Sequence, residues 1–214
     1  MKWFRRLSGP SVKEEAGASR GRSQVEVQPS LALGTLFRQL RKDRVYHILE
    51  LGPAVGHNIE FLSRFSCRIR VEDLYRTLSS FDYVSGSDSV DFEGVFQYLL
   101  PYEGYTRFDI LFAWDLLNYL DRQEFLYLMR HLSRFCHSGT VLFALIATAK
   151  NIPERPAEYR ILDENNLECR NSSSVLRPCP RYHDVDLRHM MPSFRVYNSY
   201  LLRNGMKEYL FVSN

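Results

Sequence analysis

Residues 47–62, HILELGPAVGHNIEFL, place a short apolar run, a glycine-containing turn and a helical pattern in direct succession. The run before the turn fits a strand that is buried on both faces. After the turn, apolar residues recur at helical spacing: Ile59, Leu62 and Phe65. Glycine lets a backbone turn tightly or approach a ligand without an intervening Cβ atom. Gly52 and Gly56 therefore mark either a purely structural turn or one edge of a binding site.

Strand and helix patterns alternate at least three times between residues 45 and 148. Further strand patterns are CRIRVEDL (67–74), FDILFAWDLL (108–117) and GTVLFALIAT (139–148). An amphipathic helix is predicted in RQEFLYLMRHLSRFCH (122–137), ended by Gly139. This alternation favours an α/β fold with a mostly parallel sheet and helices on both faces. Two strand patterns around the Asn204-Gly205 turn, FRVYNSYLL and MKEYLFV, predict a C-terminal antiparallel hairpin.

Weaker patterns predict two further helices and an insertion. A helix is expected after Pro29, and another in DFEGVFQYLLPYEGY, ending near Pro101. Residues 149–193 form an insertion before the hairpin. We expect it to contain a small hairpin in EYRILDENNLECR (158–170) and a short helix in PRYHDVDLRHMMP (180–192).

Composition and charge indicate one domain of residues 31–214 behind a flexible basic leader of residues 1–30. The 214-residue chain is 45% hydrophobic and 25% charged, which is typical of a globular protein. Residues 1–30 contain six basic and three acidic residues, and they account for the whole net charge of +3. The neutral remainder argues against nucleic acid as a partner. Trp3 and Phe4, beside basic residues, allow weak membrane-surface contact through residues 1–10, and a disordered tail is the alternative.

The cysteines point to the cytoplasm and not to a metal. The chain has four scattered cysteines, and no signal-peptide pattern follows its basic start. Cys169, Cys179, His183 and His189 lack the close pairs of a zinc site, so no metal is predicted.

Acidic residues lie at the ends of the predicted strands. Glu72 and Asp73 follow Gly52 by 20 and 21 positions, where a carboxylate can accept hydrogen bonds from ribose hydroxyls. Ala54 breaks the dinucleotide-binding glycine pattern. Glu50 can hold the turn or lie near a cationic part of a ligand. Asp115 fits equally an N-cap or a functional role.

These residues carry a resemblance to a known superfamily. ILELGPAVGHNIEFL resembles the first motif of class I S-adenosylmethionine-dependent methyltransferases, whose pattern is acid-x-Gly-x-Gly-x-Gly. The segment from Phe108 to Ile146 is similar to the superfamily's fourth strand, following helix and fifth strand. The closing hairpin matches its antiparallel seventh strand. The resemblance covers roughly residues 45–150 and 194–212, and it implies a Rossmann-like fold with S-adenosylmethionine as cofactor.

The resemblance also implies roles for individual residues. The methionine and ribose side of the cofactor would be lined by Glu50, Gly52, Ala54 and Gly56. Glu72, and less so Asp73, would hold the ribose. Trp114 and Asp115 would face the methyl group or substrate. Independently of the resemblance, methyl transfer needs a base only if the acceptor carries a proton that must leave early, and Asp115, Tyr119 or a histidine could then serve. The middle glycine of the motif is Ala54, and the adenine-contacting acid has only two candidate counterparts, Asp88 and Asp91.

The expected function is methyl transfer from S-adenosylmethionine to a small-molecule acceptor, with residues 149–193 shaping the acceptor pocket. The alternative, favoured by Ala54 and by the missing adenine acid, is a non-catalytic methyltransferase-like module. That module would bind a protein partner or act as a scaffold.

Overall fold

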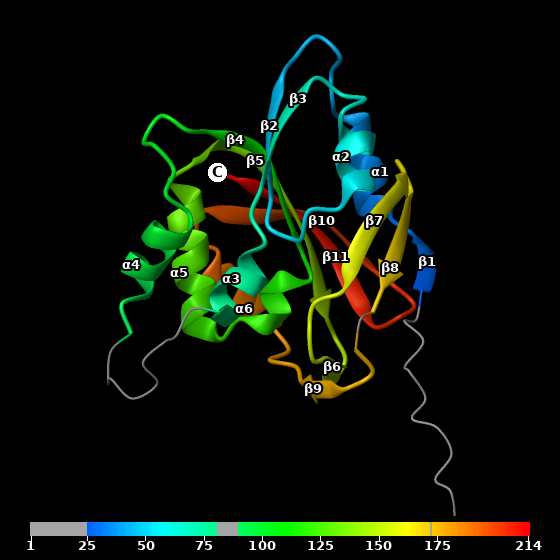
Figure 1. The fold of residues 1–214 in the computed structure, drawn as a ribbon, viewed down its shortest axis with the longest axis vertical. Coiled ribbons are helices and arrows are strands. Elements are labelled where there is room, and N and C mark those ends of the chain that lie inside the picture. The colour runs from blue at the N-terminus through cyan, green and yellow to red at the C-terminus, as the bar shows by residue number, and fades with distance from the viewer. Residues whose placement is uncertain (1–24, 81–89, 172) are drawn as a thin grey trace, which may run out of the picture.

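A computed structural model describes residues 25–80, 90–171 and 173–214, and its central element is a six-stranded sheet (Figure 1). The strands run in the order β10, β11, β5, β4, β2, β3. Their bounds are β2 (Tyr46–Glu50), β3 (Cys67–Val71), β4 (Phe108–Trp114), β5 (Cys136–Ala147), β10 (Phe194–Leu201) and β11 (Met206–Ser213). The four strands β2 to β5 are parallel, and β10 and β11 form the antiparallel hairpin predicted at the end of the chain.

Strand order reverses at β2. The chain passes from β2 outward to β3, and then returns to place β4 on the other side of β2. In open α/β sheets a crevice forms outside the carboxyl ends of the strands at such a switch point. The turn at Gly52 lies at this position, directly after β2.

Helices cover both faces of the sheet, which confirms the predicted fold class. One core packs the sheet against α3, α4, α5 and α6. A second core lies between the opposite face and α1, α2 and the β7–β8 hairpin. Figure 1 shows α1 and α2 to the right of the sheet, and α4 and α5 to its left. The helix bounds are α1 (Leu31–Arg38), α2 (Gly56–Leu62), α3 (Leu74–Ser80), α4 (Phe92–Leu99), the 3-10 turn η1 (Leu116–Tyr119), α5 (Arg122–Ser133) and α6 (Asp184–Met190).

The start of the domain corrects one predicted boundary. Residues 25–29, assigned to the flexible leader, form strand β1 (Val25–Pro29), which pairs with β8 of the insertion. Ser30 then caps α1, because its hydroxyl accepts a hydrogen bond from the Leu33 amide at 3.2 Å. The pairing joins residues about 140 positions apart, which local sequence patterns do not reveal. Residues 1–10, whose sequence fits a disordered tail or a weak membrane-surface contact, lie outside the described residues.

The insertion contains the predicted hairpin and helix. Strands β7 (Glu158–Asp163) and β8 (Asn166–Arg170) pair antiparallel around residues 164–165, and β1 completes a three-stranded sheet. Short strands β6 (Asn151–Pro153) and β9 (Leu176–Pro178) pair with each other, and α6 lies within residues 180–192. None of the helices described is long and apolar enough to cross a membrane.

Gly139 does not end α5, contrary to the prediction. The helix ends at Ser133, and β5 begins at Cys136, before the glycine. Gly139 has φ +91°, a left-handed conformation that suits an irregularity near the start of this strand. Thr140 fixes the irregularity, because its hydroxyl accepts from the His137 amide at 3.0 Å and donates to the Phe108 carbonyl at 2.7 Å.

Candidate functional site at the carboxyl ends of β2, β3 and β4

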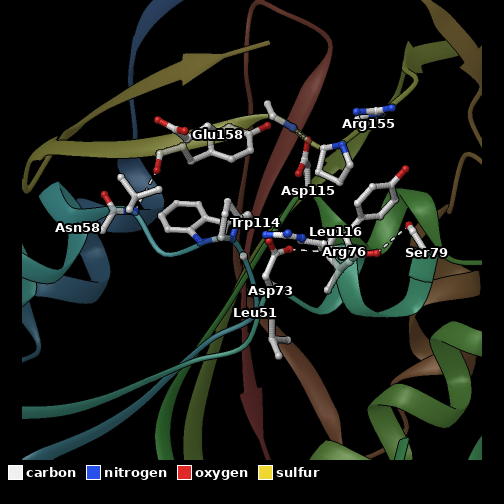
Figure 2. A pocket seen from close by; sticks show the side chains of 18 of the residues that line it. Leu51, Asn58, Asp73, Arg76, Ser79, Trp114, Asp115, Leu116, Arg155 and Glu158 are labelled. Carbon is white, nitrogen blue, oxygen red and sulfur yellow. Dashed lines mark hydrogen bonds between the residues drawn. The ribbon is translucent and has the colours of Figure 1, made fainter. Parts of the chain in front are cut away.

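A cavity of about 710 Å³ lies at the carboxyl ends of β2, β3 and β4, where the strand order reverses (Figure 2). Its floor is the turn after β2, and its roof is the segment that leads into β7. The cavity is lined by Leu51, Gly52, Pro53, Val55, Asn58, Asp73, Tyr75, Arg76, Ser79, Ser80, Ala113, Trp114, Asp115, Leu116, Glu154, Arg155, Pro156, Ala157, Glu158 and Tyr159. Charged groups of both signs therefore surround an aromatic centre.

Trp114 dominates the floor. Its indole packs on the backbone of Gly52 so closely that a Cβ atom there would come within 2.8 Å of Cδ1. The indole also stacks on the ring of Tyr159 in the roof, with centroids 5.5 Å apart and planes 6° apart. Trp114 has φ 45°, a conformation that is rare for a bulky residue. Figure 2 shows its ring between Asn58 and Asp115, with Asp73 below.

Glu50 lies beneath the turn and does not line the cavity. Its Oε1 atom accepts hydrogen bonds from the Gly52 amide, at 3.2 Å, and from the indole N–H of Trp114. Its Oε2 atom is buried and has no hydrogen-bond partner among the residues that the structure describes. Burial raises the pKa of Glu50 to about 8, although both hydrogen bonds oppose the rise. The side chain is therefore mostly protonated at neutral pH, and it fixes the shape of the turn.

Asp73, and not Glu72, faces the cavity. Asp73 lines it together with Arg76 and Ser79, and its Oδ1 atom accepts from the Arg76 amide at 3.3 Å at the start of α3. Glu72 is not among the lining residues. Partial burial raises the pKa of Glu72 above its ordinary value, and the nearby positive charge of Arg70 opposes this rise. Both acids follow Val71, the last residue of β3, and of the two it is Asp73 that lines the cavity.

Asp115 is a buried carboxylate at the end of β4, with 5% of its surface exposed. Its Oδ2 atom accepts from the Ala157 amide in the roof at 3.0 Å. Burial raises the pKa of Asp115 to about 7, opposed by hydrogen bonds from Ala157 and the Tyr159 side chain. Although Asp115 precedes η1, its side chain makes no capping hydrogen bond. It lines both the main cavity and an adjacent cavity of about 180 Å³.

Tyr119, the other predicted catalytic residue, does not line the main cavity. Its hydroxyl donates to the Arg155 carbonyl at 2.8 Å, and its ring packs edge-on against Tyr75 at 5.4 Å. It lines the smaller cavity of about 180 Å³. Burial raises the pKa of its phenol well above the ordinary value. Tyr119 thus holds the roof in place.

The remaining predicted residues lie away from the cavity lining. Ala54 and Gly56 are exposed on the outer part of the turn, and a Cβ atom at Gly56 would meet nothing within 4 Å. Asp91 caps α4, where its Oδ1 atom accepts from the Gly94 amide at 3.0 Å. Asp88 lies outside the described residues. The structure therefore gives Asp91 a structural role and brings Gly52, Asp73, Trp114 and Asp115 together.

Two buried asparagines were not predicted. Asn58 on α2 donates to the Tyr159 carbonyl at 2.9 Å and accepts from the Ile161 amide at 2.8 Å, so it pairs with β7 as a neighbouring strand would. Asn118 donates to the carbonyls of Asp115 and Leu145 and accepts from the Ala147 amide, each at 2.8 Å. The only sequence signal is an amide at a position where the surrounding pattern is apolar.

No known protein family and no curated protein matches the sequence. Among solved structures, the chain is similar to the PH0226 protein of Pyrococcus horikoshii, with 14% identity, a TM-score of 0.49, and coverage of 85% of this chain and 88% of that one. An S-adenosylmethionine-dependent methyltransferase of Clostridium acetobutylicum gives 11% identity, a TM-score of 0.46, and coverage of 84% and 87%.

The CcbJ methyltransferase of Streptomyces caelestis gives 12% identity, a TM-score of 0.46, and coverage of 85% of this chain and 94% of that one. The strand order, with its reversal at β2 and its closing antiparallel hairpin, is that of a Rossmann-like α/β fold. Similarity at this level of identity shows nothing about activity.

Proposed function

We propose that this protein is an S-adenosylmethionine-dependent methyltransferase that acts on a small-molecule acceptor. The observation that carries the proposal is the cavity of about 710 Å³ at the topological switch point, with Gly52 in its floor and Asp73 at its rim. Its volume is within the range of small-molecule sites, about 300–1,000 Å³. A glycine turn and a strand-end carboxylate are the two groups that a ribosyl ligand requires there.

The lining residues fit this cofactor. The Asp73 carboxylate is placed to accept hydrogen bonds from ribose hydroxyls, and the backbone at Leu51 and Gly52 can pass close to the ligand. When bound, the cofactor supplies an electrophilic methyl group, so the protein mainly positions the acceptor and excludes water. Asp115 lies between the two cavities and is half ionised near pH 7, so it can accept a proton from an acceptor hydroxyl or amine.

One observation favours a second candidate function, that of a non-catalytic binding module. The Trp114 indole occupies the space beside Gly52 that a side chain would fill, and its N–H is engaged by Glu50. If the indole stays there, it restricts how closely a ligand can approach the turn. The roof surface would then present charged residues to a protein partner: Glu154, Arg155 and Glu158.

Calorimetric titration with S-adenosylhomocysteine tests the two functions. We expect saturable binding that Asp73→Asn weakens by about tenfold or more, because the amide offers one acceptor oxygen where the carboxylate offers two charged ones. Asparagine caps helices as well as aspartate, so α3 keeps its start. Glu72→Gln is the matched control and should bind like the unmodified protein. Equal losses in both variants would contradict the assignment of Asp73.

Absence of both heat and thermal shift at millimolar ligand would overturn the enzymatic proposal. Repeating the titration with a Trp114→Phe variant then distinguishes two causes for the absence of binding. Binding that appears only in this variant would mean that the indole blocks a competent site. No binding in either protein would favour the non-catalytic module.

A further inference from the structure

A second groove, of about 540 Å³, lies at the opposite end of the central sheet, where the parallel strands begin. It is formed by the starts of β2, β3, β4 and β5 and by the loop that joins α4 to β4. Its lining residues are Arg44, His47, Ile48, Arg68, Ile69, Arg70, Tyr105, Thr106, Arg107, Phe108, Asp109 and His137. Four of these are arginines and only Asp109 is acidic. The proposed methyltransferase function makes no use of this groove.

A row of polar side chains crosses four adjacent strands in the groove. Arg68 on β3 is paired in register with His47 on β2, and Asp109 on β4 and His137 on β5 continue the row. Asp109 accepts from the His47 amide at 2.8 Å, lies 3.0 Å from Nε2 of His137, and forms an ion pair with Arg44. The single carboxylate is therefore already shared by three partners.

Two of the four guanidinium groups, those of Arg70 and Arg107, are held in place by contacts that do not neutralise them, whereas Arg44 is paired with Asp109. Arg107 on the α4–β4 loop donates to the carbonyls of Gly104 and Thr106 at 2.7 and 2.6 Å. Arg70 lies over the ring of Tyr102 at 5.0 Å. These contacts fix the arginines while leaving their charge free, which lowers the entropic cost of binding a ligand.

The positive charge in the groove is not balanced locally. Within the part of the chain that the structure describes, Arg68 and Arg107 form no ion pair. Arg70 interacts electrostatically with the carboxylate of Glu72. A concave surface with excess charge of one sign concentrates ligands of the opposite sign. Planar guanidinium groups match phosphate oxygens in paired hydrogen bonds.

We propose that this groove binds a small phosphate-bearing anion. Its volume suits a molecule of metabolite size. Apolar lining residues can contact the part of the ligand that carries no phosphate: Tyr105, Ile48 and Ile69. An extended nucleic acid is disfavoured because residues 31–214 carry no net charge. The groove is a site separate from the cavity at the carboxyl ends.

Isothermal titration of the full chain with inorganic pyrophosphate at low salt tests the proposal. We expect saturable binding that an Arg68→Gln/Arg107→Gln double variant weakens by about tenfold or more. An Arg195→Gln/Arg203→Gln double variant removes the same charge from exposed positions on the C-terminal hairpin, and should bind unchanged. All four arginines are exposed, so folding is expected to be unaffected, and thermal unfolding checks this.

Three outcomes would overturn the proposal. The first is no saturable binding at millimolar pyrophosphate, and the second is an equal loss in both double variants, which would indicate non-specific charge attraction. The third is a single-stranded oligonucleotide that binds more tightly and displaces pyrophosphate, which would make the groove part of a nucleic-acid surface. Added S-adenosylhomocysteine should leave pyrophosphate binding unchanged, because the two sites lie at opposite ends of the strands.

Discussion

The indole of Trp114 lies directly on the backbone of Gly52, the residue whose lack of a side chain makes the turn after β2 possible. The two residues are 62 positions apart, and Glu50 links them through one Oε1 atom that accepts from both. Glycine is therefore required at this position by an internal contact, whether or not a ligand also uses the turn. The contact sets the depth of the candidate cofactor site.

Gly52→Ala should destabilise the fold, because the new methyl group would come within 2.8 Å of Cδ1 of Trp114 and 3.1 Å of Oε1 of Glu50. Overpacking of this kind costs about 1–3 kcal/mol. Gly56→Ala is the matched comparison, since its Cβ atom would meet nothing within 4 Å and helix formation favours alanine. Denaturant unfolding of both variants checks the pair. A Gly56→Ala variant as unstable as Gly52→Ala would contradict the claim that close packing against Trp114 and Glu50 requires glycine at position 52.

Glu50→Gln should stabilise the protein at alkaline pH. The pKa of Glu50 is about 8 in the fold and near 4.5 in an unfolded chain. Both states are protonated below about pH 4, so no penalty arises there. Between these values only the unfolded state loses the proton, so the free energy of unfolding falls as pH rises, until the folded state also ionises near pH 8.

Glutamine stays neutral and keeps an acceptor for the Gly52 and Trp114 N–H groups, so it avoids this loss. The gain at pH 9 should be several kcal/mol at most, at about 1.4 kcal/mol per pKa unit, and close to zero at pH 4. Urea unfolding at both pH values measures it, with exposed Glu60→Gln as the control. A gain that is the same at both pH values would point to packing and not to ionisation.

Ionisation of Glu50 should also be visible in tryptophan fluorescence. The chain has two tryptophans, and Trp3→Phe leaves Trp114 as the sole emitter. An excited indole shifts electron density away from its N–H end, so a negative charge on Glu50 should move emission to longer wavelength. We expect a transition with a midpoint near pH 8 that Glu50→Gln abolishes. A transition that persists in the double variant would belong to another group.

Asn58→Ala should loosen the roof of the cavity. It removes both buried hydrogen bonds to β7 and leaves the Tyr159 carbonyl and the Ile161 amide without their partner. We expect a loss of about 2–6 kcal/mol, given about 1–3 kcal/mol for each of the two groups left unsatisfied. Hydrogen exchange at the Ile161 amide should accelerate more than at amides of α5. Exposed His57→Ala, one residue earlier, should change neither quantity.

The parts of the fold that were predictable are those set by local periodicity. Apolar spacing within single segments predicts the succession of β2, α2 and β3. It also predicts the amphipathic α5 and the closing hairpin. The boundary at residue 30 was wrong, because β1 is defined by its pairing with β8 and not by its own composition. Likewise, β5 begins before Gly139, where Thr140 holds the strand through hydrogen bonds with His137 and Phe108 that the local pattern does not reveal.

The candidate site shows the same division between local and non-local information. Position after a strand identified Gly52, Trp114 and Asp115 as neighbours. Choosing Asp73 over Glu72 required knowing how the chain turns between the end of β3 at Val71 and the start of α3 at Leu74, which local periodicity does not specify. The support of the roof by Tyr119 and Asn58 depends on backbone atoms of a segment far along the chain.

Strand β1 also determines where the domain can be shortened. Its five residues cover one side of β8, and Ser30 both caps α1 and donates from its amide to the Asn165 carbonyl at 2.7 Å. Removing residues 1–30 would turn β8 into an open edge, and unpaired strand edges recruit strands from other copies. A chain that begins at residue 31 should therefore self-associate. A chain that begins at residue 24 keeps β1, so β8 should stay covered.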